Sequence, residues 1–248
     1  MNHLEHCEAL DVEITRFSDV LGASDPLRSV PSCPAWSVRD LGEHLGEVHR
    51  WAEHLVREHA QVRISSNDMG LDLGPVSPSW ILEGGTQLLA TLRKCNPDLA
   101  MWAWGADQHA RFWSRRQLHE TLMHRIDLEL ALGVEPHADA TTAADAIDEF
   151  LVNLPCAKVF APKVTELVGS GSRLAFTERD GDRRWVVMLG EDGISLVQDN
   201  ELADVELRAN TLDLLLVLYR RRQIEEVNIS ITGDRELLHF WLANSALG

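Results

Sequence analysis

The chain has 248 residues, of which 45% are apolar and 25% charged, ordinary values for a globular protein of one large domain or two small ones. Its 39 acidic and 23 basic residues give a formal net charge of -16, which argues against a nucleic-acid or membrane-surface binder because such a surface repels phosphate groups. No apolar run approaches the roughly 18 residues of a membrane-spanning helix, and the acidic N-terminus is unlike a signal peptide.

The first half of the sequence predicts four helices joined by loops. Apolar residues recur near the helical period, and Ser37 stands at an N-cap position with Asp40 three residues later. Proline- and glycine-rich stretches separate the helices, and Gly133 ends the fourth. Such a succession is typical of a four-helix bundle. The helices are expected at residues 4–22, 38–59, 79–94 and 112–132.

The second half changes to short alternating segments separated by turn signals such as Arg179-Asp180-Gly181-Asp182. This pattern predicts a compact α+β domain. The whole chain is therefore expected to be an α+β protein of two domains, a helical bundle over residues 1–145 and a small α/β domain over residues 146–248. In the second half, helices are expected at residues 142–154, 211–221 and 234–242, and strands at 173–177, 185–189, 194–197, 205–208 and 227–231.

The four cysteines are widely spaced and include no CxxC pair. A disulfide framework would need a denser pattern, so we expect reduced and mostly inert thiols in a cytoplasmic protein. They are Cys7, Cys33, Cys95 and Cys156.

Histidine is distributed unevenly, with ten of the eleven residues among the first 137. Because histidine is the commonest metal ligand and proton carrier, histidine chemistry is expected in the N-terminal half. His44 falls on the apolar stripe of the second helix, where a polar ring needs a partner. A hydrogen-bonded core histidine is the ordinary explanation for His44. His49 flanks the stripe, and His54 and His59 are expected to be solvated.

The fourth helix carries Glu120 and His124 one turn apart on one face, with Asp127 three residues further on. Two donors at this spacing form half of a helix-borne metal site. The pattern is HExxxH, which differs from the HExxH of zinc proteases, and His119 is expected to point elsewhere. An ordinary surface Glu–His pair is the alternative. Together with His44, the pair would supply two imidazoles and one carboxylate, the composition of a catalytic zinc-type site with open positions.

The stretch Cys33-Pro-Ala-Trp-Ser-Val-Arg-Asp-Leu and the stretch Glu120-Thr-Leu-Met-His124-Arg-Ile-Asp127 resemble the mycothiol-dependent maleylpyruvate isomerase family. The resemblance covers nearly the whole chain and departs at Ala35 and Arg220, where the family commonly has glycine. It implies a DinB-like four-helix N-terminal domain and a sterol-carrier-like C-terminal domain. Fold transfers more readily than substrate in such a family.

The resemblance also implies site residues and cofactors. His44, Glu120 and His124 would bind one divalent metal, with zinc as the expected ion, and mycothiol would be the thiol cosubstrate. Arg221 matches an arginine that would hold a carboxylate of the substrate through its bidentate fork. The alternative for Arg221 is a solvated cation at a helix C-terminus. A metal with an open position can bind the sulfur and deprotonate the thiol, so no protein cysteine is required.

We therefore expect a mycothiol-dependent metalloenzyme that activates the thiol for attack on an electrophilic small molecule, as in maleylpyruvate isomerisation, in a cleft between the domains. One alternative is a mycothiol S-transferase of detoxification or secondary metabolism. A second is a non-catalytic small-molecule-binding or regulatory protein. A third is a metal-dependent hydrolase with Asp127, His49 or Glu47 as general base. The oligomeric state stays open.

Overall fold

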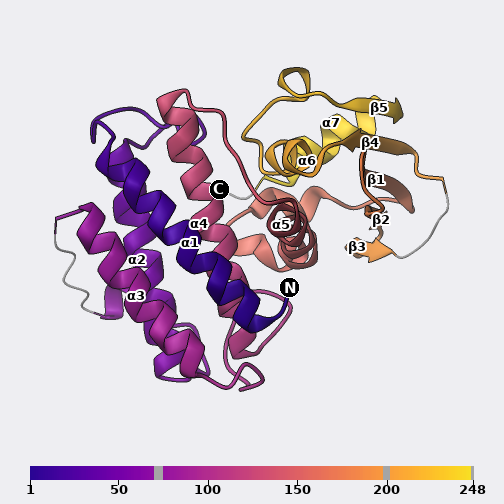
Figure 1. Ribbon diagram of the computed structural model, residues 1–248. Helices are drawn as coiled ribbons and strands as arrows, with labels where there is room; N and C mark the ends of the chain where they lie inside the picture. Colours follow the sequence, from indigo (N-terminus) through magenta and orange to yellow (C-terminus); the bar gives the residue numbers. More distant parts are fainter. Residues whose placement is uncertain (70–74, 198–201, 247–248) are drawn as a thin grey trace. The chain divides into compact units, whose positions relative to one another are not determined.

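The computed structural model describes residues 1–69, 75–197 and 202–246. The chain forms two compact units (Figure 1): the first contains Met1–Ala103 and Asp107–His137, and the second contains Trp104–Ala106 and Ala138–Gly248. A boundary between residues 145 and 146 would fall inside helix α5 (Ala140–Asn153), and the domain limits expected from the sequence stay a prediction. Among the described helices, none has both the length and the apolar character needed to cross a membrane.

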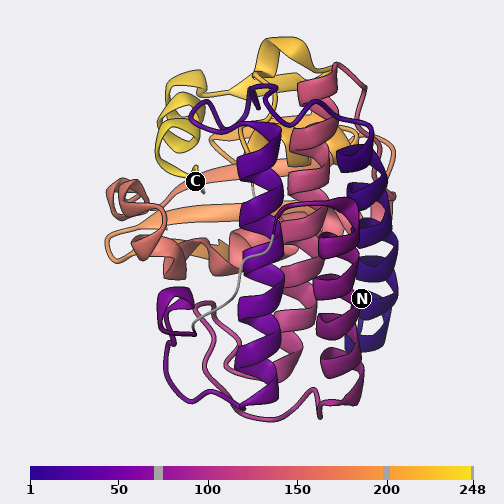
Figure 2. The ribbon, with the colours of Figure 1, turned by 90° about the vertical axis from the view of Figure 1, so that its left-hand side faces the viewer.

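The first unit is a four-helix bundle, as the sequence predicts. Helices α1 and α2 each pack against both α3 and α4, and the four run side by side in Figure 2. A 3-10 turn, η1 (Ser66–Met69), follows α2. The helices are α1 (His3–Gly22), α2 (Val38–Arg57), α3 (Pro78–Lys94) and α4 (Ala110–Leu132).

Capping residues fix the ends of the bundle helices. The Ser37 side chain accepts a hydrogen bond from the Asp40 backbone while the Asp40 side chain accepts one from the Ser37 backbone, so the predicted capping box of α2 is confirmed. Helix α4 ends at Gly133, which has a left-handed φ of 72°. Within α2, Gly46 allows close packing of α3, because a Cβ there would lie 1.9 Å from the Trp80 ring.

The second unit contains a five-stranded mixed sheet in the order β3-β2-β1-β4-β5. Strands β1 and β4 pair in parallel and the other neighbours are antiparallel. Helix α6 packs against α5 and the central strands, and α7 packs against β4. The predicted α+β fold is thereby confirmed. The strands are β1 (Ser172–Glu178), β2 (Arg184–Gly190), β3 (Gly193–Val197), β4 (Val205–Ala209) and β5 (Ser230–Gly233); the helices are α5, α6 (Thr211–Leu218), α7 (Arg235–Asn244) and the 3-10 turns η2 (Leu154–Val159), η3 (Pro162–Glu166) and η4 (Ile224–Glu226).

Several predicted boundaries are shifted by two or three residues, and a local cause can be named for three of them. Helix α6 ends at Leu218, three residues before the expected end, because the chain turns at Arg220, whose φ is 61°. The last strand starts at Ser230 instead of Val227, because η4 occupies the preceding residues. Helix α2 ends at Arg57, since His59 has a φ of 52°.

Candidate metal centre

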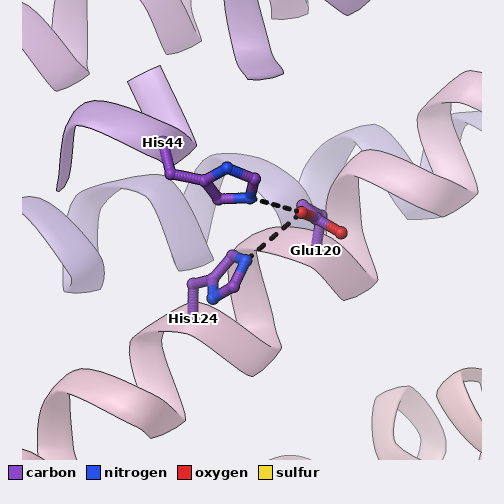
Figure 3. A group of neighbouring side chains, drawn as sticks. All are labelled: His44, Glu120 and His124. Carbon is purple, nitrogen blue, oxygen red and sulfur yellow. Dashed lines mark hydrogen bonds and ion pairs between the residues drawn. The ribbon is translucent and has the colours of Figure 1, made fainter. Parts of the chain in front are cut away.

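The structure brings together the three side chains predicted as metal ligands. His44 projects from α2, and Glu120 and His124 project from α4 (Figure 3). The Nε2 atom of each histidine lies 3.2 Å from the same carboxylate oxygen, Oε1 of Glu120. One ligand atom from each of the three residues lies within 4.8 Å of the others. Two nitrogens and one oxygen therefore converge on a single point.

The centre is only partly buried. The side chain of His44 is 33% exposed, that of Glu120 is 21% exposed and that of His124 is 10% exposed. The ring of Trp36 lies beside both histidines, with its centroid 4.8 Å from that of His44 and 6.2 Å from that of His124. The exposure of His44 leaves room for a further small ligand, and Trp36 supplies an apolar wall.

A hydrogen-bonded chain fixes the orientation of His124. Its Nδ1 atom lies 3.0 Å from Oδ2 of the fully buried Asp127, and the Ser32 hydroxyl donates to Oδ1 of Asp127 at 2.6 Å. A carboxylate behind the imidazole holds a proton on Nδ1 and leaves Nε2 directed at the metal position. Asp127 is thus engaged inside the bundle, and its suggested role as a general base is not supported.

Arg116 orients the carboxylate of Glu120, as Asp127 orients the ring of His124. Its guanidinium donates to Oε2 of Glu120 at 2.8 Å, which leaves Oε1 directed at the two histidines. The spacing of Arg116 and Glu120, one helical turn apart, is the sequence signal for this contact. No sequence spacing indicates Ser32, because it lies 95 residues from Asp127.

These contacts set the charges of the centre. Burial favours a protonated Glu120, but the charge of Arg116 and the hydrogen bonds from His124 and His44 outweigh it and hold the pKa of Glu120 well below its usual range. Burial would lower the pKa of His124, but its contacts with Asp127 and Glu120 raise it to about 9. Without an ion, His124 is therefore a cation between two carboxylates.

His49 is not a flanking residue but a fully buried one. Its Nε2 atom lies 2.9 Å from the Thr121 hydroxyl, and burial lowers its pKa to about 3. An imidazole with so low a pKa and no solvent exposure is a weak proton acceptor, which does not favour its suggested role as a general base. Among the other histidines, His59 is exposed as expected, His54 is half-buried, and His119 is buried with its ring 6.3 Å from that of His6.

The donor set fits a divalent ion. Two imidazoles and a carboxylate are the protein ligands of many catalytic zinc sites, which keep a fourth position open. The carboxylate behind His124 is the outer contact that metal-binding histidines usually have. The three residues could hold a metal, and their assignment as ligands stays a prediction.

Arg221 belongs to the second unit. It follows the end of α6, and its guanidinium donates to the backbone oxygen of Tyr219 at 2.9 Å. Its role in holding a substrate carboxylate stays a prediction.

Comparisons with known proteins agree with the sequence resemblance. Residues 7–129 match the mycothiol maleylpyruvate isomerase N-terminal domain, and residues 141–240 match the C-terminal domain of the same family. No curated protein matches the chain in sequence.

Two solved structures of one enzyme share the fold of this chain. A crystal structure of the mycothiol-dependent maleylpyruvate isomerase covers 93% of each chain with a TM-score of 0.59 and 14% identity. A histidine-to-alanine variant of that enzyme gives the same coverage and TM-score at 13% identity. A ubiquinone synthesis protein, UbiJ-SCP2, covers 46% of this chain and 95% of its own with a TM-score of 0.29 and 16% identity. With both of its domains matched, the chain belongs to the mycothiol maleylpyruvate isomerase family.

Proposed function

We propose that the protein is a mycothiol-dependent metalloenzyme, in which a divalent ion bound by His44, Glu120 and His124 activates the thiol of mycothiol for attack on an electrophilic small molecule. The observation that carries this proposal is the convergence of two Nε2 atoms on one oxygen of Glu120. Zinc is the expected ion, and a maleylpyruvate isomerase-like reaction is the first expectation.

When bound, such an ion supplies a Lewis acid that lowers the pKa of a coordinated thiol. The chain's own residues prepare the position for it. Asp127 orients the ring of His124, and Arg116 fixes the carboxylate of Glu120. Trp36 covers one side of the two imidazoles and limits water there.

Two of the four cysteines, Cys7 and Cys95, are poor candidates for the nucleophile. Burial raises the pKa of the Cys7 thiol to about 11 and also raises that of Cys95. A protonated thiol is a weak nucleophile at neutral pH. Neither of these two thiols is therefore suited to the role that we assign to the thiol of mycothiol.

The test is thiol-dependent turnover by the full chain. We expect cis–trans isomerisation of maleylpyruvate, followed by absorbance, only when both mycothiol and the metal are present. Removal of the metal by chelation should abolish the rate, re-addition of zinc should restore it, and His44→Ala should remain inactive after re-addition.

Other outcomes would change the assignment. Conjugation of mycothiol to monobromobimane without isomerisation would identify an S-transferase that uses the same site. Turnover that needs metal but no thiol would favour a hydrolase. A metal-loaded protein with neither thiol-dependent activity would contradict the proposal and favour a binding protein.

A further inference from the structure

The candidate ligands stand on two helices that each pack more extensively against another helix. Helix α2, which carries His44, packs mainly against α3, and α4, which carries Glu120 and His124, packs mainly against α1 (Figure 3). A functional site needs its side chains held within about 0.5 Å of their working positions. The convergence of the three side chains therefore depends on contacts that fix α2 against α4.

A buried hydrogen bond joins α2 to α4 beside the centre. The Nε2 atom of His49 lies 2.9 Å from the hydroxyl of Thr121, and both residues have no solvent exposure. Thr121 directly follows Glu120 in the chain, and His49 lies five residues after His44, roughly 7.5 Å along the axis of α2. The bond therefore holds the two helices next to the positions from which the ligands project.

The direction of this hydrogen bond follows from the second contact of Thr121. The hydroxyl donates its single proton to the backbone oxygen of Gln117 at 2.7 Å, so toward His49 it can only accept. His49 must then carry its proton on Nε2 and donate it to Thr121. Burial lowers the pKa of His49 to about 3 and keeps the ring neutral, so the link adds no positive charge that would repel a divalent ion.

Packing alone does not explain a histidine at position 49. Its Nδ1 atom is buried and has no hydrogen-bond partner among the described residues. An unpaired polar atom in the interior costs free energy, and an apolar side chain such as leucine would avoid this cost. A histidine is favoured here if the hydrogen bond from Nε2 performs a task that leucine cannot.

We propose that His49 is a positioning residue for the candidate metal centre, and that its hydrogen bond to Thr121 fixes α4 against α2 so that His44 meets Glu120 and His124. His49 is not a ligand in this account, because it acts through Thr121 and the two helices. The proposal rests on the proposed function, since it presupposes that the centre binds an ion.

The test measures zinc affinity by competition with a chelating dye, together with the visible absorption of bound Co²⁺, which reports coordination geometry. His49→Leu removes the donor and keeps an apolar group of similar size. We expect it to weaken zinc binding about tenfold, the lower end of the effect of outer contacts on metal sites, and to change the Co²⁺ spectrum. His49→Gln offers an amide N–H in place of Nε2–H and should restore most of the affinity and the native spectrum.

A second variant removes the same bond from the other helix. Thr121→Val deletes the acceptor, should reproduce the loss of affinity, and decides the matter if His49→Leu does not fold. The double variant should lose no more affinity than either single variant, because both remove one interaction. Thr91→Val is the matched control, since it removes a hydroxyl that α3 donates to Glu53 of α2 at 2.8 Å, and it should leave zinc affinity and the Co²⁺ spectrum unchanged.

The outcomes separate this proposal from the proposed function. Native affinity and a native spectrum in both His49→Leu and Thr121→Val, when the native protein binds zinc, would overturn the positioning role and leave the proposed function intact. An equal loss of affinity in Thr91→Val would also overturn it, because the loss would then follow from bundle stability alone. A native protein that binds no zinc would overturn both proposals.

Discussion

Helix α4 contributes to two polar clusters, which differ in how hydrogen-bond donors pair with acceptors. In the arginine cluster (Glu13, Arg125 and Glu129), each nitrogen of Arg125 has its own acceptor: Nε lies 2.5 Å from Glu13, one terminal nitrogen lies 2.6 Å from Glu129, and the other lies 2.7 Å from the backbone oxygen of His137. The Arg125 side chain is 1% exposed. The charge of Arg125 is thus matched by carboxylates of the chain itself.

In the histidine cluster (His44, Glu120 and His124), two nitrogens share one oxygen, and both nitrogens of His124 face carboxylates. The ring must carry an extra proton to satisfy this arrangement, and a divalent ion can replace that proton. The comparison teaches that a structural cluster pairs each donor with its own acceptor, whereas a binding cluster converges on a shared point and stays partly exposed. Four substitutions or conditions can test this difference.

The largest effect is expected in the arginine cluster. Arg125→Met should lower the free energy of unfolding by about 3–5 kcal/mol, because the buried Glu13 and the partly buried Glu129 both lose their ion pair with this arginine. Chemical denaturation of the metal-free protein measures this. The control Arg57→Met removes a half-exposed arginine paired with Glu53 and should cost less than about 1 kcal/mol. A loss that small for Arg125→Met would show that the cluster is not a structural one.

The next effect is on metal affinity. Glu120→Gln should weaken zinc binding more than about 100-fold, since even the loss of an outer contact to a ligand costs about 10–100-fold. Competition with a chelating dye measures the affinity. Glu129→Gln is the matched control on the same helix, and it should change stability but not zinc affinity. Similar affinities for the two variants would remove the distinction between the clusters.

A smaller effect should follow from the residue behind His124. Asp127→Asn should weaken zinc binding by about 10–100-fold, because the amide no longer holds the proton on Nδ1. Ser32→Ala, which removes only the hydroxyl that orients Asp127, should have a lesser effect in the same direction. Unchanged affinity in Asp127→Asn would mean that His124 is held by packing alone.

The smallest effect concerns pH. Because the pKa of His124 is raised to about 9 in the metal-free fold, its stabilising contribution is complete below its ordinary pKa of 6.5 and is lost as pH rises through 9. The free energy of unfolding of the chelated protein should therefore fall as the pH rises through this window. His124→Gln should flatten that part of the profile. An unchanged slope in the variant would contradict the assigned charge.

The sequence predicts the ligand positions better than their surroundings. Helical spacing places Glu120 and His124 on one face, and the apolar stripe of the second helix singles out His44, but their assignment as ligands depends on the family resemblance. Asp127 was interpreted as a possible base, because spacing places it near His124 but does not show that it is buried and bound by Ser32. The burial of His49 cannot be predicted from the pattern of its own helix, because it depends on the packing of α4 and on a tertiary contact between His49 and Thr121.

Secondary structure was also predictable where local signals determine it and not where distant contacts do. Caps and periodicity predict the four bundle helices, since these signals lie within each helix. The end of α6 could not be predicted, because arginine rarely adopts the left-handed conformation that stops the helix at this point. The contact of Arg220 with Leu242 that accompanies it joins residues 22 positions apart.

The measurement that tests the central claim most directly is the metal content per chain, determined by elemental mass spectrometry on protein purified without chelator. We expect close to one zinc-like ion in the native protein and loss of that ion in both His44→Ala and His124→Ala. The folded Arg125→Met variant should retain the ion. A native protein without metal, or variants that retain the ion, would contradict a metal centre formed by these residues.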